Sequence, residues 1–141
     1  MAGKKAENFR MSIPSVLDEI TKVEAMAEKA ADKMKFSEEE KDSLAIAVTE
    51  AVNNAILHGN KQDKNKKVHI NFEFEKTRLV VSIKDEGKGF NPDKISDPLA
   101  PENLLKESGR GLFIVSSLMD DVQYHFHKDG TEINLIKEKK S

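Results

Sequence analysis

The sequence predicts an α/β fold, a two-layer sandwich in which a mixed, mostly antiparallel sheet is covered on one face by helices. Five short segments alternate apolar and polar residues, so each strand has one face to bury. Three other segments repeat apolar residues at three- and four-residue steps, as amphipathic helices do. A length of 141 residues suits one domain with one core and is too short for two ordinary domains.

The composition limits the classes of function to consider. A formal charge of -2 and a pI near 6.1 argue against a protein that binds the phosphate backbone of nucleic acids, which needs a basic face. The absence of cysteine excludes disulfides and thiolate metal sites, and no apolar run approaches the roughly 18 residues needed to span a bilayer. Because the start of the chain is polar and lacks an apolar signal stretch, we expect a cytoplasmic protein.

A strand and a helix are predicted at the start of the folded part. Residues 9–13 alternate apolar and polar side chains, a strand pattern that stops at Pro14. Ser15, with Asp18 three residues later, is similar to the capping box that begins many helices. The apolar positions that follow share one helical face: Val16, Ile20, Val23, Ala27, Ala30, Ala31 and Met34.

The central helix begins at a second capping signature, Ser37 with Glu40. Its apolar residues recur at three- and four-residue steps, which marks one face as buried. We expect Gly59 to end this helix in the left-handed conformation that glycine allows. Residues 60–67 are basic and rich in turn formers, which favours a solvated loop over a phosphate-binding one.

Two β-hairpins are predicted in the second half, at residues 68–83 and 122–135, because strictly alternating segments flank turn residues in both. Between the hairpins, residues 91–108 hold three prolines and little periodicity, which is typical of a functional lid or a disordered segment. Residues 112–119 then form a short amphipathic pattern. The predicted sheet therefore contains the first strand and both hairpins.

Three histidines lie on predicted strands. His125 and His127 fall on the face opposite the core residues, and His69 has the same status. Two histidines at alternate strand positions can bind a metal ion, but no third ligand has a matching position. Solvated strand histidines are therefore the better interpretation.

The polar side of the central helix is the first candidate for a site. Glu50, Asn54 and His58 are spaced at i, i+4 and i+8, so they form one polar stripe along a regular helix. Asn53 and Asn54 in mid-helix are poor choices for helix stability, so another requirement selects them. Taken alone, a solvated helix face remains the better explanation of this stripe.

Two glycine-containing segments are the other candidates. Asp85 at a strand end is followed by Gly87 and Gly89, which permit a close backbone approach but are also typical of a tight turn. Gly109 and Gly111 precede the short helix 112–119, and the exposed N–H groups at a helix start attract anions. This second segment indicates phosphate binding.

The order of these signals resembles the ATP-binding family shared by gyrase, heat-shock protein 90, histidine kinases and MutL. The resemblance covers residues 9–136, and the segments TEAVNNAILHGN and SGRGLFIVSSLMDDV are most similar to the anti-sigma factor serine kinase branch. Three motifs of the family match in order, as an N box and two glycine boxes: Glu50-x-x-x-Asn54, Asp85-x-Gly87-x-Gly89 and Gly109-x-Gly111.

The resemblance implies a Bergerat ATP-binding fold that uses ATP and Mg²⁺. Asn54 would offer an amide oxygen to the metal, Glu50 would act as the general base, and Asp85 would accept a hydrogen bond from the adenine amino group. His58 is interpreted as structural. The remaining nucleotide contacts would come from Gly87, Gly89, Lys106, Gly109, Arg110 and Gly111. Whether Lys106 or Arg110 supplies the phosphate contact from the lid is left open.

The same resemblance implies the partners. We expect a serine-protein kinase that binds a sigma factor, phosphorylates an anti-anti-sigma protein and forms a homodimer, with no nucleic acid and no membrane involved. The kinase domain would span residues 9–136, between a disordered tail at 1–8 and a charged, solvated tail at 137–141.

Two other classes of protein stay open. A binding switch that transfers nothing would need Asn54 but not a base, so the retained Glu50 speaks against it. The catalytic domain of a histidine kinase would need a helix pair that carries a phosphoacceptor histidine, and the 36 residues before Ser37 hold no histidine.

Overall fold

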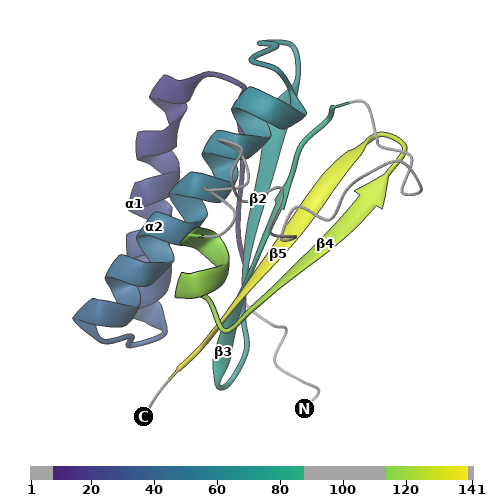
Figure 1. The fold of residues 1–141 in the computed structure, drawn as a ribbon. Coiled ribbons are helices and arrows are strands. Elements are labelled where there is room, and N and C mark those ends of the chain that lie inside the picture. The colour runs from purple at the N-terminus through teal and green to yellow at the C-terminus, as the bar shows by residue number, and fades with distance from the viewer. Residues whose placement is uncertain (1–7, 88–113, 140–141) are drawn as a thin grey trace, which may run out of the picture.

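The fold is an antiparallel sheet with helices on one face (Figure 1), seen in a computed structural model that describes residues 8–87 and 114–139. In this part of the chain the sheet has five strands in the order β1-β2-β3-β5-β4. The strands are β1 (Asn8–Pro14), β2 (Lys67–Phe74), β3 (Arg78–Lys84), β4 (Asp121–His127) and β5 (Gly130–Glu138). Every described pairing is antiparallel, so the parallel pair that a mixed sheet would contain is absent from these strands.

The helices lie together on one side of the sheet, as predicted. They are α1 (Ile20–Lys33), α2 (Glu38–Asn54) and a short helix at residues 114–118, drawn in green in Figure 1. The opposite face of the sheet is polar, and there Ser82 Oγ on β3 donates a hydrogen bond of 2.6 Å to Asn134 Oδ1 on β5. No helix in residues 8–87 or 114–139 is long and apolar enough to cross a membrane.

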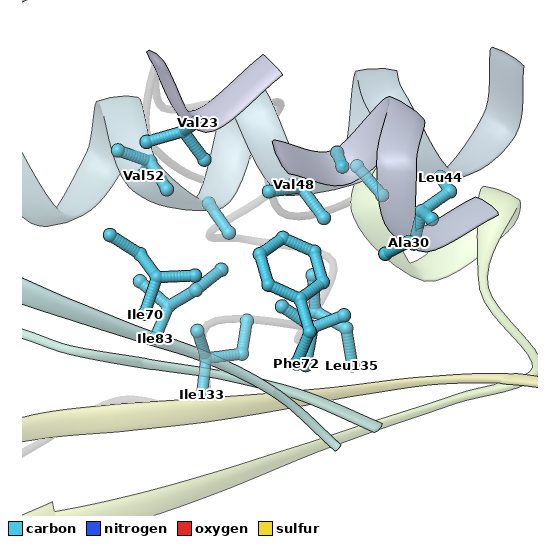
Figure 2. Packing of buried hydrophobic residues seen from close by; sticks show 14 of the residues in the cluster. Val23, Ala30, Leu44, Val48, Val52, Ile70, Phe72, Ile83, Ile133 and Leu135 are labelled. Atoms are coloured by element: carbon cyan, nitrogen blue, oxygen red, sulfur yellow. The ribbon is translucent and has the colours of Figure 1, made fainter. Parts of the chain in front are cut away.

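The core lies between the sheet and the helices, because the alternating strands turn their apolar residues to that side (Figure 2). Phe72 at the centre of β2 is fully buried and is paired in register with Val81 of β3. Fully burying a side chain of this size contributes about 1.5–3 kcal/mol. The helices add the buried residues Val23, Ala27, Ala30, Ala31, Leu44, Ala47, Val48, Ala51 and Val52.

The two predicted helix starts have different outcomes. At Ser37 the capping box is present: Ser37 Oγ accepts a hydrogen bond of 3.1 Å from Glu40 N, and Glu40 Oε1 accepts one of 2.7 Å from Ser37 N. At Ser15 the prediction is wrong. A 3₁₀ turn, η1 (Leu17–Glu19), precedes α1, and Ser15 Oγ instead donates 2.6 Å to the carbonyl oxygen of Lys66. Ser15 Oγ also accepts a hydrogen bond of 2.8 Å from Asn60 Nδ2, so the oxygen that a helix cap would use has a partner far along the chain.

The C-terminal end of the sheet extends further than the sequence predicts. β5 continues to Glu138, and Lys137 is buried with 7% of its surface exposed. Its Nζ atom donates a hydrogen bond of 3.0 Å to the carbonyl oxygen of Leu118, at the end of the short helix. The solvated tail was predicted to start at residue 137, and this boundary is wrong because Lys137 and Glu138 belong to β5.

Candidate functional site

The polar stripe of α2 supplies the first part of the site. Glu50 and Asn54 are both half-buried on the regular part of the helix, one turn apart, which corresponds to about 6 Å along the axis. The Nδ2 atom of Asn54 is buried and has no hydrogen-bond partner among the described residues. Because a buried amide is normally paired, this one retains hydrogen-bonding capacity for a ligand.

The stripe does not continue to His58 as a regular helix would require. Residues after Asn54 form a π-helical turn, η2 (Ala55–Gly59), which is closed by a hydrogen bond of 2.8 Å from Asn60 N to the carbonyl oxygen of Ala55. π-helical turns are rare in proteins overall, and those that occur are often found at functional sites. The wider turn moves His58 out of the predicted i+8 register, and its side chain is exposed. The prediction that His58 is structural is not tested by this geometry.

Asp85 supplies the second part of the site. It follows β3 directly and is buried, with 6% of its surface exposed. Its Oδ1 atom accepts two backbone hydrogen bonds of 3.0 Å, one from Gly87 N and one from Thr131 N. Its own backbone N–H donates to the carbonyl oxygen of Thr131 at 3.0 Å. These bonds fix the carboxyl group, and no donor among the described residues bonds its Oδ2 atom.

Three glycines surround Asp85, and a side chain at any of them would collide with its neighbours. A Cβ atom on Gly59 would overlap Asp85 Oδ2, and one on Gly87 would overlap the carbonyl oxygen of Gly59. Gly130 has a φ of 154°, which L side chains rarely adopt, and its Cβ would overlap the carbonyl oxygen of Asp85. The close approach of these four residues makes a cradle with the Oδ2 atom of Asp85 against the end of α2.

The prediction that Gly59 is a left-handed helix end is wrong. Gly59 lies inside η2, and the left-handed residues come later, at Lys61 and Gln62, with φ of 52° and 59°. Glycine is required at position 59 because the helix end packs directly on the Asp85 carboxyl group. Local sequence signals at Gly59 do not reveal a partner that lies in another strand.

Asn60, Thr131 and Gly130 lie near Asp85 and were not predicted to be site residues. Asn60 belongs to the segment 60–67 that was predicted to be a solvated loop, yet only 1% of its surface is exposed. Its Oδ1 atom accepts a hydrogen bond of 2.7 Å from Glu86 N, next to Asp85. An asparagine directly after the last helical glycine is the one local signal that marks it.

His69 and Glu86 form a hydrogen-bonded pair beside this cradle, which corrects the interpretation of His69 as a merely solvated histidine. His69 Nε2 lies 2.6 Å from Glu86 Oε2, and His69 Nδ1 lies 2.7 Å from Ser12 Oγ. The N–H of Lys67, which donates to Glu86 Oε1 at 3.0 Å, and the His69 ring hold the pKa of Glu86 below its usual range. Since an ionised carboxylate only accepts, His69 Nε2 carries the proton in this pair.

The other strand histidines, His125 and His127, are exposed on β4. His127 Nε2 lies 3.9 Å from Glu132 Oε1, which is a loose contact. Within residues 8–87 and 114–139, no group of three or more histidine or acidic side chains gathers to hold a metal ion.

The rest of the predicted site lies outside the described residues. This applies to the second glycine of the first glycine box, the second glycine box and the basic residues near it: Gly89, Lys106, Gly109, Arg110 and Gly111. Their roles stay predictions. The described part brings Asp85 and Gly87 against Gly59, and it places Asn54 and Glu50 further along the same helix that Gly59 ends.

Comparison with known proteins identifies the family of this chain. Residues 13–137 match the histidine kinase-like ATPase domain family. The serine-protein kinase RsbW of Bacillus subtilis (strain 168) is 33% identical over 132 residues, which are 89% of this chain and 82% of that protein. The serine-protein kinase RsbW of Bacillus mycoides (strain KBAB4) is 27% identical over 140 residues, or 95% of this chain and 86% of that protein.

Solved structures show the same fold. The RsbU and RsbW domains of a Mycobacterium tuberculosis protein superpose with a TM-score of 0.70 at 14% identity, over 94% of this chain and 32% of that one. The nucleotide-free catalytic domain of the histidine kinase ThkA gives 0.61 at 16% identity, over 96% and 97% of the two chains. Together with the match over residues 13–137, the 33% identity shows that the chain belongs to the histidine kinase-like ATPase domain family, in its RsbW-like serine-protein kinase branch.

Proposed function

We propose that this chain is an ATP- and Mg²⁺-dependent serine-protein kinase that binds a sigma factor and phosphorylates a serine of an anti-anti-sigma protein. The RsbW relatives are named serine-protein kinases, and the family is named for an ATPase domain, which supports kinase activity and the use of ATP. A homodimer in the cytoplasm is part of the same proposal. The observation that carries it is the geometry of Asp85.

Asp85 is suited to recognise adenine. One of its oxygens is saturated by two backbone N–H groups, so the carboxyl group has a fixed orientation. The other oxygen lies against Gly59, whose lack of a side chain lets the end of the helix pack directly on the carboxyl group. A buried carboxylate oxygen accepts the adenine amino N–H in a bond stronger than one between neutral groups. Guanine presents an oxygen at that position and would be repelled.

Asn54 and Glu50 are suited to the phosphate end of the same ligand. Glu50 lies nine positions before Gly59, at most about 13 Å at the rise of an α-helix, so base recognition and phosphoryl transfer occupy different ends of the site. The Asn54 Nδ2 donor has no partner among the described residues and suits a phosphate oxygen, and the amide oxygen of the same side chain is a ligand type that Mg²⁺ accepts. When bound, Mg²⁺ neutralises charge on the phosphates. Glu50 would accept the proton of the attacking serine hydroxyl group.

Two variants test this division of labour. Asp85→Asn replaces part of an acceptor by a donor, so we expect ATP affinity to fall severely while the protein stays folded. Glu50→Gln keeps size and polarity, so ATP binding should persist while single-turnover phosphoryl transfer slows about a hundred- to ten-thousand-fold, and toward the low end if positioning dominates. ATP affinity is measured by calorimetry, and transfer by labelled ATP with an anti-anti-sigma protein.

Each result separates the proposal from its alternatives. Unchanged ATP affinity in folded Asp85→Asn would remove the adenine assignment. Equal transfer rates for wild type and Glu50→Gln would mean that Glu50 is an ordinary helix-face carboxylate. A wild-type protein that binds ATP and a sigma factor but transfers phosphate to no partner would instead be a nucleotide-dependent binding switch.

A further inference from the structure

Asn60 is the most completely buried polar side chain in the candidate site, with 1% of its surface exposed. It directly follows η2 and joins three segments that are far apart in the sequence. Its Nδ2 atom donates two hydrogen bonds. One, of 2.8 Å, goes to Ser15 Oγ after β1, and the other, of 2.9 Å, goes to the carbonyl oxygen of Lys67 at the start of β2. Its Oδ1 atom accepts a hydrogen bond of 2.7 Å from Glu86 N after β3.

The bonding capacity of this side chain is matched to its surroundings. Both amide hydrogens of Asn60 have acceptors and its oxygen has a donor, so a buried amide is satisfied without any ligand. Ser15 extends the network, because its hydroxyl group donates to the carbonyl oxygen of Lys66. Removing the Asn60 amide would leave the Glu86 N–H without its acceptor and would release the turn that carries Asp85.

The backbone after Asn60 adopts an unusual conformation. Lys61 and Gln62 both have positive φ, 52° and 59°, and neither is glycine. Non-glycine residues stay in this region only where surrounding contacts impose it. Here the contacts are two backbone hydrogen bonds, from Gln62 N to the carbonyl oxygen of Ile56 at 2.8 Å and from Asp63 N to the carbonyl oxygen of Asn60 at 3.0 Å. The chain is thus held in a strained path immediately beside Gly59.

We propose that Asn60 is a positioning residue for adenine recognition, which holds the end of α2 and the Asp85 turn in one fixed relation. Its backbone N–H closes η2, which carries the Gly59 wall, and its side chain holds the N–H of Glu86, the residue after Asp85. The free oxygen of Asp85 therefore keeps its place against Gly59. This inference rests on the proposed function, since it concerns the same nucleotide.

Asn60→Ala and Ser15→Ala separate positioning from simple stabilisation. Both remove bonds of the same network, but Ser15→Ala leaves the bond from Glu86 N to Asn60 Oδ1 in place. We expect Asn60→Ala to weaken ATP binding about tenfold or more, as the loss of an orienting hydrogen bond does, and to lower the ratio of ATP to GTP affinity. Ser15→Ala should lower the urea midpoint and leave that ratio unchanged. Calorimetry with both nucleotides and urea unfolding give these values.

The outcomes are distinct. A folded Asn60→Ala variant that keeps the wild-type ratio of ATP to GTP affinity overturns the inference and leaves the proposed function intact. A ratio that falls equally in both variants also overturns it, because stability alone then explains the change. Wild type that shows no preference for ATP over GTP defeats the adenine assignment and, with it, this inference.

A measurement on the wild type covers the case in which Asn60→Ala does not fold. The buried side-chain amide of Asn60 and the backbone amide of Glu86 give separate nuclear magnetic resonance signals. We expect both to shift when ADP is added, while the amide of Phe72 in the core does not. Shifts confined to Asp85 and Gly87 would overturn the positioning role.

Discussion

The two ends of α2 are built on different principles. The N-terminal end is a self-contained helix start, in which Ser37 and Glu40 bond each other and the acidic first turn complements the helix dipole. The C-terminal end widens into a π-helical turn, packs Gly59 on Asp85, and bonds distant segments through Asn60.

The difference shows where stability and function are separated in this helix. The capping box at the N-terminal end closes within one turn, so changing Ser37 should alter the free energy of unfolding and not ligand binding. Residues at the C-terminal end contact β3 and the segments near β1 and β2, so changing them should alter ligand binding as well. The three predictions below test this separation, and the largest expected effect comes first.

Gly59→Ala should have the largest effect. The added Cβ atom would overlap Asp85 Oδ2, and overpacking of this kind costs about 1–3 kcal/mol in stability. Since Asp85 must move, ATP affinity should fall by more than about tenfold. His58→Ala, one residue earlier at an exposed position of the same turn, is the matched control and should keep both values near wild type. Wild-type ATP affinity in Gly59→Ala would show that the close approach is not needed for binding.

Ser37→Ala should have an intermediate effect that is confined to stability. Loss of the capping box costs about 1 kcal/mol, measured as a lower urea midpoint. ATP affinity measured by calorimetry should not change. Ser43→Ala lies inside the same helix and, because alanine favours helices, should not destabilise the protein. If Ser37→Ala weakened ATP binding as strongly as Gly59→Ala does, the separation between the two ends would be wrong.

Glu86→Gln should have the smallest effect, and one that depends on pH. The pKa of Glu86 is lowered in the folded protein, so its carboxylate contributes stability above its ordinary pKa of 4.5 and loses that contribution as pH falls through the lowered value. Because the side chain is 40% exposed, we expect the variant to lose at most about 1 kcal/mol at pH 7.

Urea unfolding of both proteins at pH 7 and at about pH 3 checks this sign, since pH 3 lies below the ordinary pKa of a glutamate. The difference between wild type and Glu86→Gln should shrink at the lower pH. A difference that grew on acidification would mean that the pKa of Glu86 is not lowered in the folded protein.

The sequence predicted the parts of this molecule that local patterns decide. Strict alternation located the strands, and the Ser37 signature located the start of α2, because both signals depend on neighbours within a few residues. Ser15 carries the same kind of signature and failed as a cap, because its hydroxyl oxygen accepts a hydrogen bond from the distant Asn60 Nδ2 instead. A local sequence signal therefore fails where a residue far along the chain bonds the same polar group.

The same reasoning explains what was missed in the site. Asp85 was predicted as a site residue from its motif, but the groups that hold it, Thr131 N and Gly87 N, belong partly to another hairpin. Asn60 looked like one polar residue in a basic loop, and only the fold shows that it is buried. No spacing within the sequence encodes which of many polar residues will meet at one corner of a sheet.

The long sequence separations between contacting residues of the site have a consequence for how the protein folds. Thr131 is 46 residues from Asp85, and Ser15 is 45 residues from Asn60, so this corner closes long loops. The entropy of loop closure must be overcome before such contacts form, which places them late in folding. A nucleotide that binds only the completed corner stabilises the folded chain by mass action. We therefore expect the folded fraction of this protein to rise with the concentration of ATP. This effect on folding is separate from any effect of ATP on the activity of the folded protein.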